Sequence, residues 1–111
     1  MAWQSFGIEK YEVYSVAYNT PGFPTTSAFI NLFWEGKKGA TLWFKRGDAT
    51  SVTLNHWSPN VGAYYGYFGQ DQFRDAVDLL RNEKPVFFQW SDSTGARLST
   101  DQEPVGEEEV P

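Results

Sequence analysis

The chain of 111 residues has no cysteine, and it holds only one histidine and one methionine. The absence of cysteine excludes disulfides and thiolate metal sites, and a lone histidine then rules out histidine–cysteine metal sites. No stretch reaches the ~20 consecutive apolar residues of a membrane helix. The N-terminal residues also lack the basic start and apolar run of a signal peptide. We therefore expect a cytoplasmic protein with no membrane partner, no metal and no cofactor.

Catalytic motifs are scarce as well. The chain contains no Gly-x-Ser-x-Gly sequence, and the stretch Gly-Lys-Lys-Gly-Ala-Thr lacks the spacing of a phosphate-binding loop. The single histidine, His56, lies in the strand-like sequence Leu-Asn-His-Trp, which favours a structural or surface role over that of a base. Without a recognisable pair of nucleophile and base, the sequence predicts a protein that is not an enzyme.

Charge is unevenly distributed along the chain. Residues 1–100 carry nine Lys or Arg and nine Asp or Glu, whereas residues 101–111 carry five acids and no base, which accounts for the net charge of −5. We expect residues 1–100 to form a single α+β domain and residues 101–111 to be a mobile acidic tail. The tail either solubilises the protein, or docks partners or competes for the protein's own basic residues.

The cations of the chain are clustered, since four of the nine fall within ten residues. This basic cluster consists of Lys37, Lys38, Lys45 and Arg46. The low overall isoelectric point does not prevent it from attracting an anionic ligand, because the local field governs that interaction.

Rings and β-branched residues predict several strands. The first covers residues 8–18 and ends at the turn-forming sequence Asn-Thr-Pro-Gly-Phe-Pro. The clearest signal is a hairpin over residues 27–48, in which two apolar runs flank a Gly-Lys-Lys-Gly turn. We expect a further strand at residues 50–57, and a second hairpin at residues 85–100 around Asp-Ser-Thr-Gly.

One segment, residues 70–83, has the pattern of an amphipathic helix. Apolar residues recur at i, i+3, i+4 and i+7 from Phe73 to Leu80, and Pro85 follows the helix. The predicted fold class is therefore α+β: a largely antiparallel sheet of about six strands, in the order ββββαββ, with the helix packed on one face. Since one helix cannot cover both faces, the second face must meet water, a ligand or another copy of the protein.

The first hairpin separates into two faces by parity. One face carries aliphatic core residues such as Ile30 and Leu42. The other face mixes rings with amide, hydroxyl, carboxylate and ammonium groups, from Phe29, Asn31, Phe33, Glu35, Thr41, Trp43 and Lys45. A slip of one residue in the register would exchange the faces of one strand, but both faces carry rings in either register.

Rings beside cations suit two kinds of partner. One is single-stranded DNA or RNA: Phe29, Phe33 and Trp43 would stack on bases, and the basic cluster would contact phosphates. The other is a protein partner, or a second copy in a homodimer, against which the rings are buried. The remaining alternative is that the rings belong to the core.

The segment Gly62–Gly69 places four rings among three glycines. Tyrosine combined with glycine is typical of recognition loops, which makes Tyr64, Tyr65 and Tyr67 candidate ligand contacts. An edge strand that bends at its glycines is an equal alternative.

A third hypothesis for function is small-molecule binding. The ligand would lie in a cleft between the segment Gly62–Gly69 and the first hairpin. Such clefts hold a few inward polar groups, for which the sequence offers Asn55, His56 and Gln89.

Four strands followed by a helix resemble the layout of PC4-type and Whirly-type single-stranded-DNA-binding proteins. The resemblance lies in the order of elements, and the hairpin at residues 85–100 departs from the simplest version of it. It supplies no site residues. It implies single-stranded nucleic acid as the first ligand to test.

Overall fold

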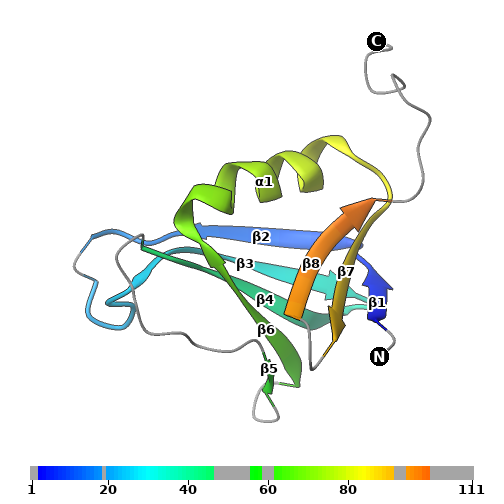
Figure 1. Cartoon of the computed structure of the whole chain (residues 1–111), viewed down its shortest axis with the longest axis horizontal. Coiled ribbons are helices and arrows are strands. Elements are labelled where there is room, and N and C mark those ends of the chain that lie inside the picture. Colours follow the sequence, from blue (N-terminus) through cyan, green and yellow to red (C-terminus); the bar gives the residue numbers. More distant parts are fainter. Residues whose placement is uncertain (1–2, 19, 47–55, 59–61, 92–94, 101–111) are drawn as a thin grey trace.

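The computed structural model describes residues 3–18, 20–46, 56–58, 62–91 and 95–100. These residues form an α+β fold with eight strands in two sheets and one α-helix (Figure 1). The fold class is as the sequence predicts, whereas the expected single sheet of about six strands is replaced by two sheets.

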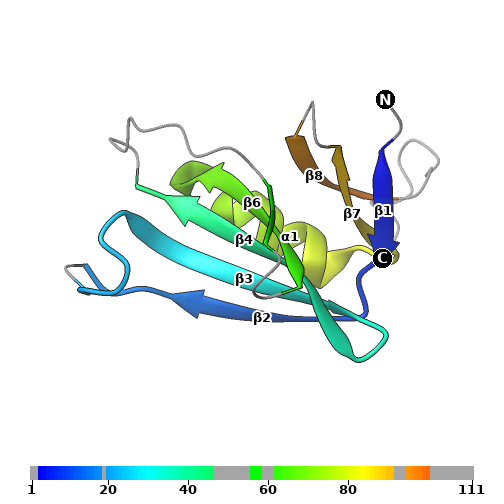
Figure 2. The ribbon, with the colours of Figure 1, turned by 90° about the horizontal axis from the view of Figure 1, so that it is seen from below.

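The larger sheet has five strands in the order β2-β3-β4-β6-β5 (Figure 2). Its members are β2 (Lys10–Ser15), β3 (Thr26–Trp34), β4 (Lys37–Lys45), β5 (His56–Ser58) and β6 (Ala63–Gly69). Neighbouring strands are antiparallel except β4 and β6, which run parallel. The segment of tyrosines and glycines is therefore an internal strand, not a recognition loop.

The smaller sheet has three antiparallel strands in the order β1-β7-β8. Its members are β1 (Gln4–Gly7), β7 (Val86–Ser91) and β8 (Gly95–Thr100). The hairpin predicted at residues 85–100 is confirmed by β7 and β8.

The strand predicted at residues 8–18 is wrong in its limits, because two strands of different sheets meet there. The N–H of Ile8 donates to the carbonyl of Val86 in the smaller sheet, and the N–H of Glu9 donates to the carbonyl of Phe33 in the larger one, each at 2.9 Å. The chain thus passes from one sheet to the other within two residues.

The predicted helix is confirmed as a short 3₁₀ turn, η1 (Gln70–Gln72), followed by α1 (Phe73–Asn82). Its apolar stripe faces the core: Ala76 is buried, and Phe73, Val77 and Leu80 pack against the core. No helix formed by the described residues is long and apolar enough to cross a membrane.

The core lies on one face of the larger sheet, under both α1 and the smaller sheet (Figures 1 and 2). Ile30 faces Leu42 across the first hairpin and Phe29 faces Trp43, so the predicted division into two faces is correct. The buried side chains include Ile30, Leu32, Leu42, Phe44, Tyr64 and Phe88. We call the opposite face of this sheet the outer face.

Two expectations fall partly or wholly outside the described residues. Of the strand expected at 50–57, only residues 56 and 57 are described, within β5. The acidic tail at residues 101–111 lies outside the described residues.

Candidate functional site

A cleft of about 580 Å³ opens where the two sheets meet. We call it the tryptophan cleft, because three of the five tryptophans line it. Its aromatic and basic lining consists of Phe6, Trp34, Trp57, Trp90, Lys37 and Lys38. Gln4 and Ser5 of β1 complete the wall.

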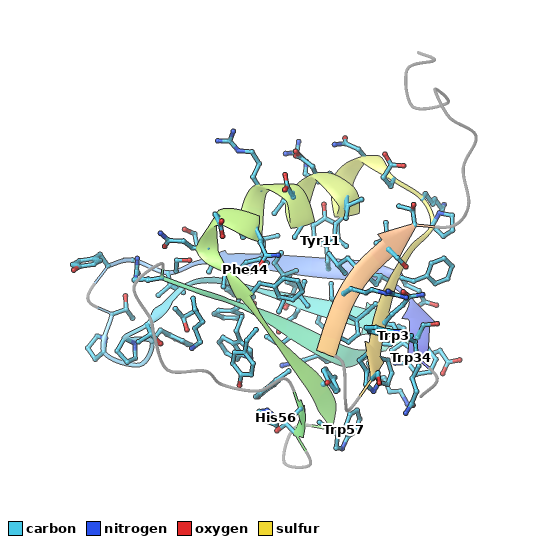
Figure 3. The ribbon with its side chains drawn as sticks, viewed as in Figure 1. Trp3, Tyr11, Trp34, Phe44, His56 and Trp57 are labelled. Atoms are coloured by element: carbon cyan, nitrogen blue, oxygen red, sulfur yellow. The ribbon has the colours of Figure 1, made fainter. Side chains whose placement is uncertain are left out.

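Three of the rings that line the tryptophan cleft pack against one another, and the fourth, Trp57, is partly exposed. Phe6 stacks on Trp34 with a centroid distance of 5.3 Å and meets Trp90 edge-on at 6.0 Å. Trp57 stays 50 % exposed. Figure 3 shows Trp34 and Trp57 toward the same end of the molecule, where β5 and the start of β1 lie. An indole that is half uncovered offers a flat surface to a ligand.

Gly39 allows this wall to form. Phe33 pairs with Lys38 and Leu32 with Ala40, so Gly39 is the extra residue of a β-bulge in β4. A Cβ atom on Gly39 would lie 2.7 Å from both the Phe6 ring and the Trp34 indole. Any larger residue here would push the rings apart.

The two lysines of the cleft are available to a ligand. The Lys37 ammonium lies 5.4 Å from the centroid of the Trp34 ring, a cation–π contact that leaves its N–H groups unused. Within the described part of the chain, the ammonium groups of Lys37 and Lys38 form no hydrogen bond and no ion pair. Lys37 shares the face of Trp34, its partner in the ladder, and points to the cleft, whereas Lys38 pairs with Phe33 on the outer face and borders the cleft.

The outer face carries a second set of rings, which we call the outer aromatic row: Tyr14, Phe29, Trp43 and Tyr67. They occupy facing positions on β2, β3, β4 and β6. Tyr14 stacks on Phe29 at 4.6 Å, and Phe29 meets Trp43 at 5.0 Å. Phe23, from the segment before β3, packs against Phe29 and Trp43 at 5.5 and 6.1 Å. The ring faces that the sequence offered to bases are thus largely occupied by other rings.

The basic cluster is divided by the structure. Lys37 and Lys45 stand at opposite ends of β4, which places them about 26 Å apart at ~3.3 Å per residue. The Lys45 ammonium donates to the hydroxyls of Thr25 (3.2 Å) and Thr26 (3.1 Å), and burial lowers its pKa.

Arg46 has a structural role next to Lys45. Its guanidinium donates to the carbonyls of Val16 and Thr26 at 3.4 and 3.3 Å, and it lies 5.1 Å from the Tyr18 ring. It ties the segment between β2 and β3 to the sheet. The four cations of the basic cluster therefore do not lie together, and of the four only Lys37 and Lys38 line the tryptophan cleft.

The three tyrosines of β6 have different surroundings. Tyr64, which the sequence suggested as a ligand contact, is fully buried against Phe88 and Trp90 and exposes no surface in this structure. Tyr65 meets Trp43 edge-on at 5.5 Å, and Lys45 lies over Tyr67 at 5.6 Å.

Burial, reinforced by the neighbouring Tyr65 phenol, raises the pKa of Tyr67. Tyr65 and Tyr67 belong to the outer face, away from the tryptophan cleft. Phe33 lines a separate, smaller cleft of about 380 Å³ beside Lys10.

The polar groups suggested for a small-molecule site do not meet in this cleft. His56 packs against Tyr65 and Tyr67, at 5.6 and 6.0 Å. The side-chain oxygen of Gln89 accepts a hydrogen bond of 2.7 Å from Arg97. Asn55 lies outside the described residues.

Sequence reasoning missed the three tryptophans of the cleft. Parity places Trp34 on the same face as Ile30, which predicts a core residue, and Trp57 and Trp90 lie in segments whose pattern predicts only strands. A weak signal existed, since Trp34 and Lys37 flank the hairpin turn and must face each other. The sequence holds no such signal for Trp57 and Trp90, because only the packing of the two sheets brings them to the cleft.

The comparisons with known proteins add no functional assignment. No family model, curated protein or solved structure matches this chain. Among the described residues, no group of three or more His, Asp or Glu side chains is placed to hold a metal ion. The tryptophan cleft is a concave site in which rings lie beside the Lys37 ammonium.

Proposed function

We propose that this protein is a non-catalytic binding protein that holds single-stranded nucleic acid in the tryptophan cleft. The observation that carries the proposal is the convergence of Trp34, Trp57 and Trp90 with Lys37 and Lys38 around one cleft. Trp57 stacks on a base, and the lysines contact the phosphates on either side.

The rings supply most of the affinity. A base stacked on an aromatic side chain contributes about 1–3 kcal/mol, whatever its identity. Bases in a duplex are already stacked on each other, so only an unpaired strand can present them to Trp57. The cleft volume, about 580 Å³, is within the ~300–1,000 Å³ of small-ligand sites, which limits it to a few nucleotides.

The cations supply the dependence on salt. Each phosphate neutralised on a single strand contributes about −0.7 to the slope of log K against log salt. Two lysines therefore predict a slope of about −1.4. The net charge of −5 weakens binding overall, and the local positive charge of Lys37 and Lys38 directs the strand to the cleft.

Titration with labelled oligonucleotides tests the proposal. We expect DNA and RNA single strands to bind at low salt and quench tryptophan fluorescence, with duplex DNA binding far more weakly. The double variant Lys37→Ala, Lys38→Ala should lose the salt dependence. Its matched control is Arg74→Ala, Arg81→Ala, which removes the same charge from exposed positions on α1 and should bind like the parent.

Two results would contradict the proposal. If no oligonucleotide of any base composition binds at low salt, the cleft does not hold nucleic acid. If a free mononucleotide binds as tightly as an oligonucleotide, the cleft is a small-molecule site and the phosphates of a strand play no part.

A further inference from the structure

Strand β2 is an exposed sheet edge with unusual apolar character. It is the outermost strand of the larger sheet, and no described strand lies beyond it (Figure 2). Val13 and Tyr14 are 43 % and 45 % exposed, and Tyr18, just past the strand, is 75 % exposed. Among the described residues, three of the four large exposed apolar side chains thus gather at this edge; the fourth is Trp57 in the cleft.

The other sheet edges are short or covered. β5 has three residues and β1 has four. β8 has Ala96 and Leu98 packed against the core and Arg97 at its centre. Proteins keep edges from pairing with other chains by shortening, covering or charging them. β2 has six residues and no proline, and its charges, Lys10 and Glu12, leave the stretch from Val13 to Ser15 without a charge.

The backbone groups that β2 presents can be assigned from the ladder. The N–H of Val16 donates to the carbonyl of Ser27, and Val16 continues the β2–β3 register, in which Ser15 faces Ala28. Hydrogen-bonded pairs alternate along an antiparallel ladder. The even-numbered residues of β2 therefore bond to β3, while the N–H and C=O groups of Tyr11, Val13 and Ser15 point off the sheet.

We propose that a second copy of this chain pairs with β2 in antiparallel fashion, around a two-fold axis at Val13. The two sheets then join into one of ten strands. Val13 faces Val13 of the second copy, and Tyr11 faces Ser15. All three residues with outward backbone groups are paired, and the exposed Val13 side chains cover each other.

The neighbouring registers are less favourable. Only the odd-numbered residues of β2 present outward backbone groups, so an odd-numbered residue of one copy must face an odd-numbered residue of the other. The two-fold axis, which is perpendicular to the sheet, then passes through a residue and not between two residues. At Glu12 it would set two carboxylates directly opposite each other. At Tyr14 it would leave only residues 13–15 paired within the strand. With the axis at Val13, Glu12 faces Tyr14 of the second copy, a pair already joined within one chain by a hydrogen bond of 3.3 Å.

Sedimentation velocity over a range of concentrations tests the pairing. One strand edge buries less than the ~1,200 Å² typical of stable complexes, so we expect a reversible dimer that grows with concentration. Val13→Pro removes an N–H that β3 does not use and should abolish the dimer. Val13→Lys, which sets two cations opposite each other, should do the same if the proline variant fails to fold. Val13→Thr keeps the shape and should still dimerise.

Amide hydrogen exchange identifies the interface itself. At high concentration we expect slower exchange at the N–H groups of Tyr11, Val13 and Ser15, and no change at Glu12 and Tyr14. Contact through the outer aromatic row would not produce this alternation. A chain that stays monomeric at concentrations on the order of 1 mM, or a dimer that survives both disruptive variants, would overturn the inference.

The pairing uses no residue of the tryptophan cleft. Oligonucleotide binding can be measured at low concentration with Val13→Lys, where the chain is monomeric. Loss of the dimer and loss of nucleic-acid binding are therefore separate outcomes.

Discussion

The tryptophan cleft and the outer aromatic row are built from the same residue types, but only the cleft leaves a ring and a cation accessible to a ligand. In the row, Phe29 has Tyr14 and Phe23 stacked on it, and the nearby cation, Lys45, donates to two threonines. In the cleft, Trp57 is half exposed, and the Lys37 ammonium lies over Trp34 without a hydrogen bond or ion pair among the described residues. Rings beside lysines therefore indicate binding only where their faces and charges are not already used within the chain.

The partial burial of the outer aromatic row also affects the pKa of the neighbouring cation, Lys45. Burial lowers the pKa of Lys45, because a desolvated ammonium is less stable than a hydrated one. A phosphate would have to displace the threonine hydroxyls to reach it. The row is thus better described as a second small core, between the sheet and the segment that carries Phe23, than as a ligand surface.

Trp43→Ala is the change with the largest expected effect, and it tests whether the row is structural. Trp43 meets Phe23, Phe29 and Tyr65. Its loss leaves a cavity that should cost about 3 kcal/mol of unfolding free energy, measured by urea denaturation. Oligonucleotide affinity of the folded protein should not change.

Trp43→Phe is the matched control for that experiment. The indole N–H of Trp43 is buried and has no hydrogen-bond partner among the described residues, so replacing the indole with a phenyl ring removes an unsatisfied donor. We expect a loss well below that of the alanine variant. If instead Trp43→Ala is stable and binds oligonucleotides poorly, the outer aromatic row, and not the tryptophan cleft, is the ligand surface.

Trp57→Ala is the complementary change in the cleft. Trp57 is half exposed, so its removal should cost less than about 1 kcal/mol of stability. The loss of one stacked base should weaken oligonucleotide binding about 10-fold or more, measured by anisotropy of a labelled strand. An unchanged affinity would show that Trp57 does not stack on the strand.

Most of the fold could be predicted from the sequence, because the patterns that indicate its helix and hairpins are local. Helix α1 follows from apolar spacing, and the two hairpins follow from runs that flank turn residues. The division at Ile8 and Glu9 was not accessible, since the alternating pattern continues across it and only contacts with Val86 and Phe33 separate the two strands. The parallel pairing of β6 with β4 likewise has no local signature.

The candidate site was less accessible, because it depends on contacts between distant segments. Parity placed Phe29 and Trp43 on one face correctly, but nothing in the sequence shows that Phe23 packs against them. Lys37 and Lys45 are close in sequence and far apart in space, because β4 is fully extended between them. Trp57 and Trp90 come together only when the two sheets meet.

Single-lysine variants compare the cation of the cleft with that of the outer aromatic row, and their expected effects on binding are smaller than that of Trp57→Ala. Lys37→Ala should reduce the salt slope of oligonucleotide binding by about 0.7, since one phosphate contact is lost. Lys45→Ala should leave the slope unchanged and lower stability by about 1 kcal/mol, because its hydrogen bonds to Thr25 and Thr26 are lost. Equal changes in slope would mean that the strand contacts both ends of β4.

The smallest expected effect is an alkaline loss of stability that originates in the outer face. Burial, together with the nearby Tyr65 phenol, raises the pKa of Tyr67 above its usual 10.0. Because the folded protein favours the neutral phenol, this contribution to stability is present below about pH 10 and is lost as the pH rises through the folded pKa. Thermal unfolding across this range should show a shallower decline for Tyr67→Phe than for the parent. Tyr18→Phe, which removes a largely exposed phenol, should keep the decline of the parent; if both variants behave alike, the decline does not come from Tyr67.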